Sequence, residues 1–203
     1  MTEPAEQDYG YLRRMYDSGP DPWRIGEGFY EQRKRRILLA SLPEPRYHSC
    51  FEPACGNGEL SVLLAARCDR LLAGDIAGQA VDRTAGRLAG TPAVQVRRMV
   101  LPDDWPDERF DLIVLSEFGY YLPWSSWQSV VARTAASVTG DWTVLACHWL
   151  PDFPERRAST EELHAELAAQ LPGRQLLSLQ DDDFRLDVFT GRPDSIAARE
   201  GRR

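Results

Sequence analysis

The sequence predicts an α/β protein with a single doubly wound domain, in which helices cover both faces of an open, mostly parallel sheet. Three observations predict this fold class. Residues 48–64 have the pattern of a strand, a tight glycine turn and a helix in succession. Residues 110–115 form a continuous apolar run, as expected for a strand buried on both faces of a sheet. Five strand-and-helix units follow one another, and two final strands form a hairpin.

The length and composition fit one domain. The chain has 203 residues, of which 43% are hydrophobic, and this is enough for one full core. We expect a flexible N-terminus at residues 1–15, a lid or helix segment at residues 16–45, a ligand-binding domain at residues 46–191 and a disordered basic tail at residues 192–203.

The N-terminal part combines a turn, aromatic side chains and a helix. Residues 17–22 are rich in Gly, Pro and Asp, which indicates a turn. Trp23 and Tyr30 lead into a helix at residues 31–42, which ends at Pro43. The aromatic side chains either form a lid over a ligand or fix this helix to the sheet, and the sequence leaves both readings open.

The middle of the chain alternates between strands and helices. The first four strands are expected at residues 48–51, 70–75, 94–96 and 110–115, and the fifth at residues 142–147. Helices are expected near residues 60–64, 79–88 and 124–138.

The last part of the chain contains one more helix and the hairpin. Ser159 and Glu162 form a capping box at the start of a helix that carries Leu163, Leu167 and Leu171. Strands at residues 175–179 and 184–189 are joined by a short polar turn.

Charge and cysteine content exclude several classes of function. The net charge of -7 argues against a nucleic-acid backbone as the main partner. No run is long and apolar enough to span a membrane, and the N-terminus has no signal-peptide pattern, so we expect a cytoplasmic protein. The cysteines and histidines have no metal-ligand spacing, so no metal is expected. The oligomeric state stays open.

The glycine turn is the candidate binding site. Glu52 ends the first strand before the turn, and Asp75 ends the second strand. The glycines let a ligand approach the bare backbone, and the following helix offers unpaired N–H groups. Two acids beside such a turn can hold the ribose hydroxyls and an amino group of a nucleoside cofactor.

Two cofactors compete for this turn. The dinucleotide fingerprint needs Gly-x-Gly-x-x-Gly, but Ser61 stands where the third glycine belongs. The acid-x-Gly-x-Gly-x-Gly pattern of S-adenosyl-L-methionine (SAM) enzymes is matched by Glu52-x-Ala54-x-Gly56-x-Gly58, with Ala54 in place of the first glycine. The sequence therefore favours SAM over a nicotinamide cofactor.

Further segments make the chain similar to class I SAM-dependent methyltransferases, and within them to the nodulation protein S (NodS) family. The resemblance covers roughly residues 20–190. The residues that carry it are Asp21-Pro22-Trp23, Tyr30-Glu31-x-x-Lys34, Phe51-Glu52-x-x-Cys55, Asp75, Phe110-Asp111-Leu112-Ile113-Val114 and Glu117-x-x-Tyr120-Tyr121-Leu122.

The resemblance implies a Rossmann-like methyltransferase domain with a seven-stranded, mostly parallel sheet that ends in a C-terminal β-hairpin. It makes residues 46–191 the SAM-binding domain. The family activity is N-methylation of a deacetylated amino sugar in a chitin-like oligosaccharide, so the acceptor here is expected to be a small molecule or a glycan. The sequence departs from the family at Ala54 and at Arg98-Met99-Val100, where an acid near the adenine amino group is often found.

The resemblance and the glycine turn together assign the cofactor site. The residues expected to bind SAM are Trp23, Lys34, Glu52, Ala54, Cys55, Gly56, Gly58, Asp75, Ile76, Met99, Val100 and Ser116.

Methyl transfer to an amine requires aligned reactants and a group that takes a proton. Glu117, Tyr121 and His148 follow strand ends at the edge where such groups belong, so they are the candidate catalytic residues. Each has an alternative role: ion pairing for Glu117, core packing for Tyr121 and structural hydrogen bonding for His148. His164 is expected at the surface or in packing.

Three tryptophans near the ends of the fourth and fifth strands can stack on a sugar ring or belong to the core; they are Trp124, Trp127 and Trp149. Two other functions stay open. One is a nicotinamide-dependent oxidoreductase, and the other is a SAM-fold binding protein without catalytic activity. The Tyr-x-x-x-Lys of short-chain dehydrogenases is missing after the glycine turn, because Lys34 lies before it.

Overall fold

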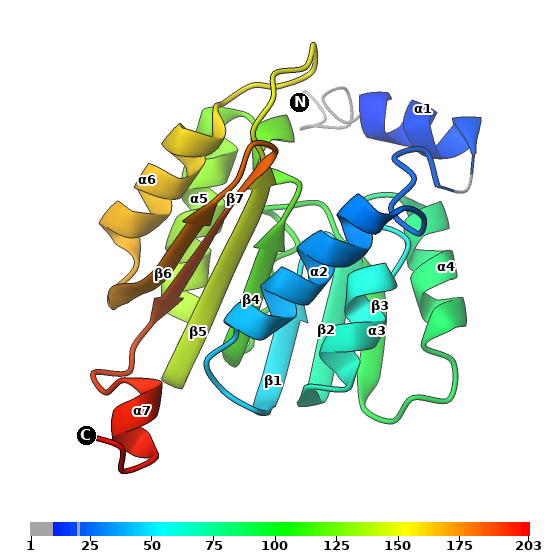
Figure 1. Ribbon diagram of the computed structural model, residues 1–203. Helices are drawn as coiled ribbons and strands as arrows, with labels where there is room; N and C mark the ends of the chain where they lie inside the picture. Colours follow the sequence, from blue (N-terminus) through cyan, green and yellow to red (C-terminus); the bar gives the residue numbers. More distant parts are fainter. Residues whose placement is uncertain (1–9, 20) are drawn as a thin grey trace.

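The computed structural model describes residues 10–19 and 21–203 and contains one seven-stranded sheet with helices on both faces (Figure 1). The strands are β1 (Tyr47–Glu52), β2 (Cys68–Asp75), β3 (Val94–Arg98), β4 (Phe110–Ser116), β5 (Val138–Trp149), β6 (Arg174–Gln180) and β7 (Phe184–Thr190). The helices are α1 (Gly10–Ser18), α2 (Phe29–Ser41), α3 (Glu59–Ala65), α4 (Gly78–Arg87), α5 (Trp124–Ser137), α6 (Thr160–Gln170) and α7 (Ile196–Arg199).

The strand order is β3-β2-β1-β4-β5-β7-β6. Strands β1 to β5 pair in parallel, and β7 pairs antiparallel with both β5 and β6. The order reverses between β1 and β4, and ligands of doubly wound sheets bind at such a switch point, beyond the carboxyl ends of the strands. The predicted fold class, including the hairpin, is confirmed.

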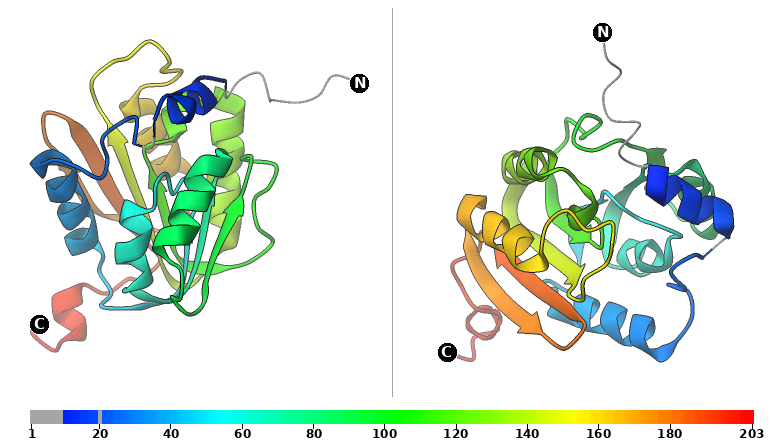
Figure 2. Two further views of the ribbon diagram at one scale, coloured as in Figure 1. Left: turned by 90° about the vertical axis from the view of Figure 1, so that its right-hand side faces the viewer. Right: turned by 90° about the horizontal axis from the view of Figure 1, so that it is seen from above.

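Two apolar cores lie on opposite faces of the sheet, because side chains alternate along each strand. Phe51 and Ile113 point to one core together with Trp127 of α5 and Leu163 of α6. The other core contains residues of α2 and α3 and alternate strand residues, among them Leu38, Leu64, Leu71, Leu112 and Val114. Figure 2 shows α5 and α6 on one side of the sheet and α2, α3 and α4 on the other.

Helix ends follow the predicted capping. Ser159 accepts a hydrogen bond from the backbone N–H of Glu162, and the Glu162 side chain accepts one from the Ser159 N–H, so the predicted capping box is present.

The C-terminal segment differs from the sequence prediction. Residues 192–203 are predicted to be disordered, but they contain the short helix α7. Arg192 and Arg199 both form ion pairs with Glu44, and Arg192 also pairs with Asp141. Sequence periodicity cannot reveal these contacts, because Glu44 lies about 150 residues earlier in the chain. At the other end, residues 1–9 of the predicted flexible N-terminus lie outside the described residues, and α1 begins at Gly10.

None of the described helices is long and apolar enough to cross a membrane. In the same residues, no group of three or more His, Cys, Asp or Glu side chains is arranged to hold a metal ion.

Candidate active site

The glycine turn between β1 and α3 needs its glycines for different reasons. Gly56 and Gly58 have φ values of 55° and 84°, which favour a residue without a Cβ. A Cβ at Gly58 would lie 2.9 Å from Thr84 Oγ1 and 3.0 Å from its Cα, so this glycine also allows α3 and α4 to pack closely. Gly58 therefore shapes the turn and does not line the cavity that the turn borders.

A cavity of about 650 Å³ lies at the carboxyl edge of the sheet, between the glycine turn, α2 and the ends of β4 and β5. Nine of the predicted site residues line it: Trp23, Lys34, Glu52, Ala54, Cys55, Gly56, Ser116, Glu117 and Tyr121. A smaller cavity of about 80 Å³ lies beside it and is lined by Asp75, Ile76 and Met99, together with Trp23, Ala54 and Tyr121. The structure thus brings most of the predicted residues to one edge.

Val100 and His148 are not among the lining residues of these cavities. The N–H of Val100 donates to Asp104 Oδ2 at 2.8 Å, so an acid does lie next to this strand end, four residues further along the chain. His148 is fully buried behind the cavity wall. Its ring nitrogens contact Gly119 N and His164 Nε2, at 3.3 and 3.0 Å.

Asp75 is a buried carboxylate with few partners. Its oxygens accept hydrogen bonds from the N–H groups of Gly56 and Ala77, each at 2.9 Å. Burial raises the pKa of Asp75 to about 6, against the lowering effect of these backbone donors. Asp75 lines the smaller cavity, and a carboxylate has about four acceptor sites, so it can also accept hydrogen bonds from hydroxyl groups of a ligand.

Glu52 lies deeper at the same turn. Its Oε2 accepts a hydrogen bond from Ser61 Oγ at 2.5 Å, and the side chain is almost fully buried. Burial, with a smaller contribution from the Asp75 charge, raises the pKa of Glu52 to about 8, against the lowering effect of the Ser61 hydrogen bond. A cationic amino group in the cavity would favour the charged form of this acid.

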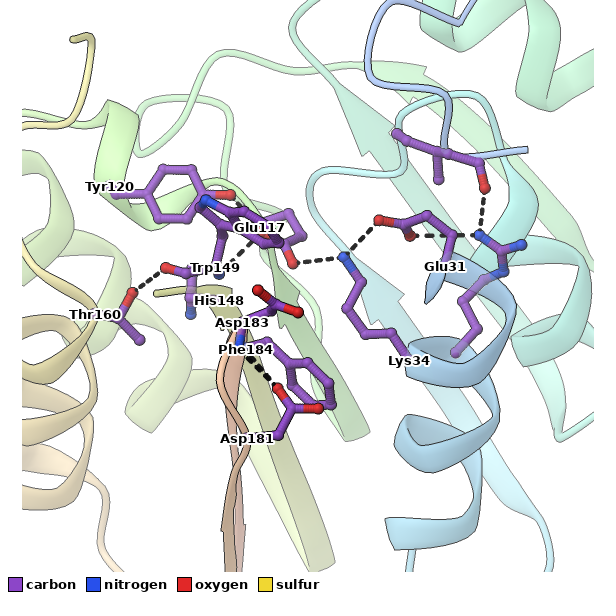
Figure 3. Close-up of polar contacts among 12 residues, drawn as sticks. Glu31, Lys34, Glu117, Tyr120, His148, Trp149, Thr160, Asp181, Asp183 and Phe184 are labelled. Carbon is purple, nitrogen blue, oxygen red and sulfur yellow. Dashed lines mark hydrogen bonds and ion pairs between the residues drawn. The ribbon is translucent and has the colours of Figure 1, made fainter. Parts of the chain in front are cut away.

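A group of hydrogen-bonded residues surrounds Glu117, just beyond the end of β4 (Figure 3). Its Oε1 accepts a hydrogen bond from Lys34 Nζ at 2.8 Å. Its Oε2 accepts one from the Tyr120 hydroxyl and one from the Trp149 N–H, the latter at 3.2 Å. Glu117 has φ of 60°, an unusual value for a residue with a side chain, and such strain concentrates at functional sites.

Lys34 links this group to α2. Its ammonium also contacts Glu31 Oε1 at 3.0 Å and lies 5.2 Å from the centre of the Tyr30 ring. Burial lowers the pKa of Lys34, but the Glu117 and Glu31 carboxylates outweigh burial and raise it. The lysine is therefore a permanently charged bridge across the cavity (Figure 3).

Other lining residues are absent from the sequence-based assignment, among them Tyr30, Glu31, Asn57 and Tyr120. Asn57 Oδ1 and the Tyr30 hydroxyl are buried without a hydrogen-bond partner. Buried polar atoms of this kind are costly, so both are available to a ligand. Sequence reasoning had two signals for these residues: Tyr30-Glu31-x-x-Lys34 and Glu117-x-x-Tyr120, which both belong to the segments that carry the family resemblance.

The tryptophans have different environments. Trp127 is fully buried and donates its Nε1–H to Leu163 O at 3.3 Å, so it belongs to the core. Trp149 lines the larger cavity, whereas Trp124 is exposed and lines neither cavity. His164 is fully buried, so of its two expected positions, at the surface or in packing, the structure has the second.

A segment before α2 covers the cavities. Tyr11 of α1 packs on Tyr121, with 5.9 Å between ring centres, and Tyr16 packs on Trp23 at 5.2 Å. Asp21 accepts hydrogen bonds from the N–H groups of residues 25 and 26 at 2.8 and 2.7 Å, which closes the loop into a compact turn. Figure 1 shows α1 lying across the carboxyl edge of the sheet.

The sequence matches one family and several of its members. A family model described as Nodulation protein S (NodS) matches residues 5–135, more than half of the chain. Nodulation protein S of Rhizobium tropici is 34% identical over 119 residues, which cover 58% of this chain and 50% of that protein. Nodulation protein S of Bradyrhizobium diazoefficiens is 33% identical over 103 residues, covering 50% and 49%. The chain thus spans about half the length of the curated relatives that it matches.

Two solved structures are similar over more of the chain. A protein from Pseudomonas syringae, described as a candidate methyltransferase, is 41% identical, with 80% of this chain and 99% of that chain covered and a TM-score of 0.72. The N-methyltransferase NodS from Bradyrhizobium japonicum WM9, in complex with S-adenosyl-L-homocysteine, is 22% identical. It covers 93% of this chain and 100% of its own, with a TM-score of 0.80, which shows a shared fold.

Proposed function

The chain belongs to the nodulation protein S (NodS) family, and from that premise we propose that it is a SAM-dependent methyltransferase that methylates a nitrogen atom of a small-molecule or amino-sugar acceptor. One observation carries the proposal. A single cavity is lined both by the glycine turn with its buried acid Glu52 and by the Glu117 carboxylate. A cofactor held at the turn would therefore share one cavity with an acid that suits an amine.

The residues at the turn fit SAM. Asp75 has free lone pairs for ribose hydroxyls, and Ile76 and Met99 give apolar contact beside it. Glu52 and the unpaired Asn57 Oδ1 are acceptors for an amino group. When bound, SAM supplies an electrophilic methyl group on a sulfonium.

The residues on the opposite wall fit the acceptor. We propose that the Glu117 carboxylate takes up the proton of an incoming amine, as general bases do, as the amine nitrogen displaces the sulfur of SAM from the methyl group. Lys34 and the Tyr120 hydroxyl hold this carboxylate in place through hydrogen bonds. Tyr121 and Trp149 supply aromatic walls on which a sugar ring can stack.

The comparisons support the cofactor and the reaction class. The Pseudomonas syringae relative is described as a candidate methyltransferase, and the solved NodS is described as an N-methyltransferase in complex with S-adenosyl-L-homocysteine. The acidic net charge supports a small or glycan acceptor over nucleic acid. A cytoplasmic location fits the four buried cysteine thiols, because thiols persist in reducing compartments.

Thermal unfolding with SAM and with NAD separately tests the proposal. At 100 times its dissociation constant, a ligand stabilises the folded state by about 2.7 kcal/mol. We expect SAM to raise Tm by about 5–10 °C for a chain of this size and NAD to leave it unchanged. Methyl transfer to glucosamine oligosaccharides is then measured. A shift with NAD alone favours the oxidoreductase, and a shift with SAM but no transfer to any amine favours an inactive binding protein.

We also propose that residues 23–34 act as a lid that closes over bound SAM. Trp23 lies between the two cavities and Lys34 spans the larger one, so ligand binding should restrict both. Hydrogen exchange of backbone amides in this segment is expected to slow when SAM is added, while α7, at the opposite edge of the sheet (Figure 1), stays unchanged. Equal protection without SAM would instead mean that the segment permanently fixes α2 to the sheet.

A further inference from the structure

Three fully buried polar side chains form a chain behind the cavity wall. They are His148 on β5, His164 on α6 and Asp187 on β7. His148 Nδ1 lies 3.0 Å from His164 Nε2, and His164 Nδ1 lies 2.7 Å from Asp187 Oδ2. Arg185 Nε donates to the same Asp187 oxygen at 3.0 Å. The methyl-transfer chemistry above uses none of these groups.

The contact between the Gly119 N–H and His148 determines which ring nitrogen of each histidine carries the proton. The Gly119 N–H can only donate, so His148 Nε2, 3.3 Å away, must be an unprotonated acceptor. His148 then carries its proton on Nδ1 and donates it to His164 Nε2. His164 in turn carries its proton on Nδ1 and donates it to the Asp187 carboxylate. Burial lowers the pKa of His148, which keeps this imidazole neutral.

This series of hydrogen-bonded side chains ends at the loop that carries Glu117. We define the acid loop as residues 117–122; it includes the short 3₁₀ helix Gly119–Tyr121. Gly119 packs directly on the imidazole, because a Cβ there would lie 3.0 Å from His148 Nε2 and 2.9 Å from Trp127. Glu117 is two residues before this contact, and Tyr120, which donates to Glu117, is the next residue.

We propose that His148, His164 and Asp187 are positioning residues that fix the acid loop, and through it the Glu117 carboxylate, for methyl transfer. The inference rests on the proposed function of the cavity. None of the three side chains is among the residues that line either cavity, so they act through the Gly119 backbone and do not contact the acceptor. An apolar core would be simpler to build, because each buried polar group costs free energy unless it is paired. The Asp187 carboxylate can only accept, so it fixes the tautomer of His164 and, through His164, the tautomer of His148.

A matched pair of substitutions at His148 tests this role. His148→Gln places an amide oxygen near the position of Nε2, so it can still accept from the Gly119 N–H. His148→Asn is too short to reach Gly119 but keeps a donor near the position of Nδ1. We expect His148→Asn to lower kcat on the order of 10-fold to 100-fold, as small misplacements of reacting groups do, with KM for SAM little changed. His148→Gln should recover most of this loss. Equal kcat values for the two variants would overturn the proposal.

Nuclear magnetic resonance of the wild-type protein gives a readout that does not depend on turnover or on the variants folding. Nitrogen-15 chemical shifts should show both His148 and His164 as neutral Nδ1–H tautomers. A protonated ring or an Nε2–H tautomer at His148 would overturn the proposed chain. If these tautomers are found but SAM neither binds nor reacts with the wild-type protein, the proposed function fails and the chain still fixes the acid loop.

Hydrogen exchange of the Gly119 amide is the third measurement that tests the proposal. In His148→Asn the Gly119 N–H loses its acceptor, so it should exchange faster than in the wild type or in His148→Gln. Unchanged exchange in His148→Asn would mean that the imidazole does not hold the loop, and would also overturn the proposal.

Discussion

Replacing Glu117 with glutamine is expected to lower the rate of methyl transfer by about 10²–10⁴-fold, while the affinity for SAM stays close to that of the wild type. Glutamine keeps the shape of the side chain and can accept the hydrogen bond from Lys34 Nζ. It cannot take up the proton of an amine. Turnover on an amino-sugar acceptor and SAM binding by calorimetry measure the two quantities separately.

Glu31→Gln is the matched control for this prediction. Glu31 lies on the other side of the Lys34 ammonium, 3.0 Å away, and the substitution removes the same charge from the same cavity. If Glu117 acts as the base, Glu31→Gln should lose at least about ten times less activity than Glu117→Gln. Equal losses would mean that both acids only balance Lys34. Normal turnover of Glu117→Gln would place the acceptor elsewhere, and Trp149 is then the next residue to test.

The second large effect is expected at Asp75, in the proposed cofactor site. Asp75→Ala should weaken SAM binding by roughly 1–3 kcal/mol, because ribose hydroxyls would lose their acceptor. This corresponds to about a 5-fold to 150-fold rise in the dissociation constant. Isothermal calorimetry measures it. Since Asp75 also accepts from the Gly56 and Ala77 N–H groups, the variant should unfold at a lower temperature as well.

Asp69→Ala is the control variant for Asp75→Ala, and it separates an effect on SAM binding from an effect on protein stability. Asp69 lies on the same strand but near its amino end, where it is exposed and pairs with Arg46. Its substitution is expected to leave SAM affinity unchanged and to change stability little, because exposed ion pairs contribute little to it. Unchanged SAM affinity in folded Asp75→Ala would remove Asp75 from the cofactor site.

The chain order of helices and strands could be predicted because it rests on local patterns. The continuous apolar run of β4, the capping box of α6 and the glycine turn before α3 are all contained in short segments of sequence. Parallel strands in a doubly wound sheet present their carboxyl ends at one edge, so Glu52, Asp75 and Glu117 could be placed near each other before any coordinates.

The roles of individual side chains could not be predicted in the same way. His148 lies near the carboxyl end of β5, yet its ring turns inward to His164, which α6 supplies sixteen residues later. Asn57 lies between the two glycines of the turn, and only its unpaired, buried oxygen indicates a binding role. Arg199 was assigned to a loose tail, but Glu44 binds it.

The sequence by itself therefore determined the fold class and the edge of the sheet that carries the candidate site, because hydrophobic periodicity and glycine spacing act over a few residues. The resemblance of several short segments indicated the family. The tertiary structure decided which side chains meet there. Lys34 of α2 reaches Glu117, and the Glu117 backbone is held by Cys147 of β5, through contacts between segments far apart in the chain. Such contacts depend on side-chain direction and burial, which strand and helix periods leave undetermined.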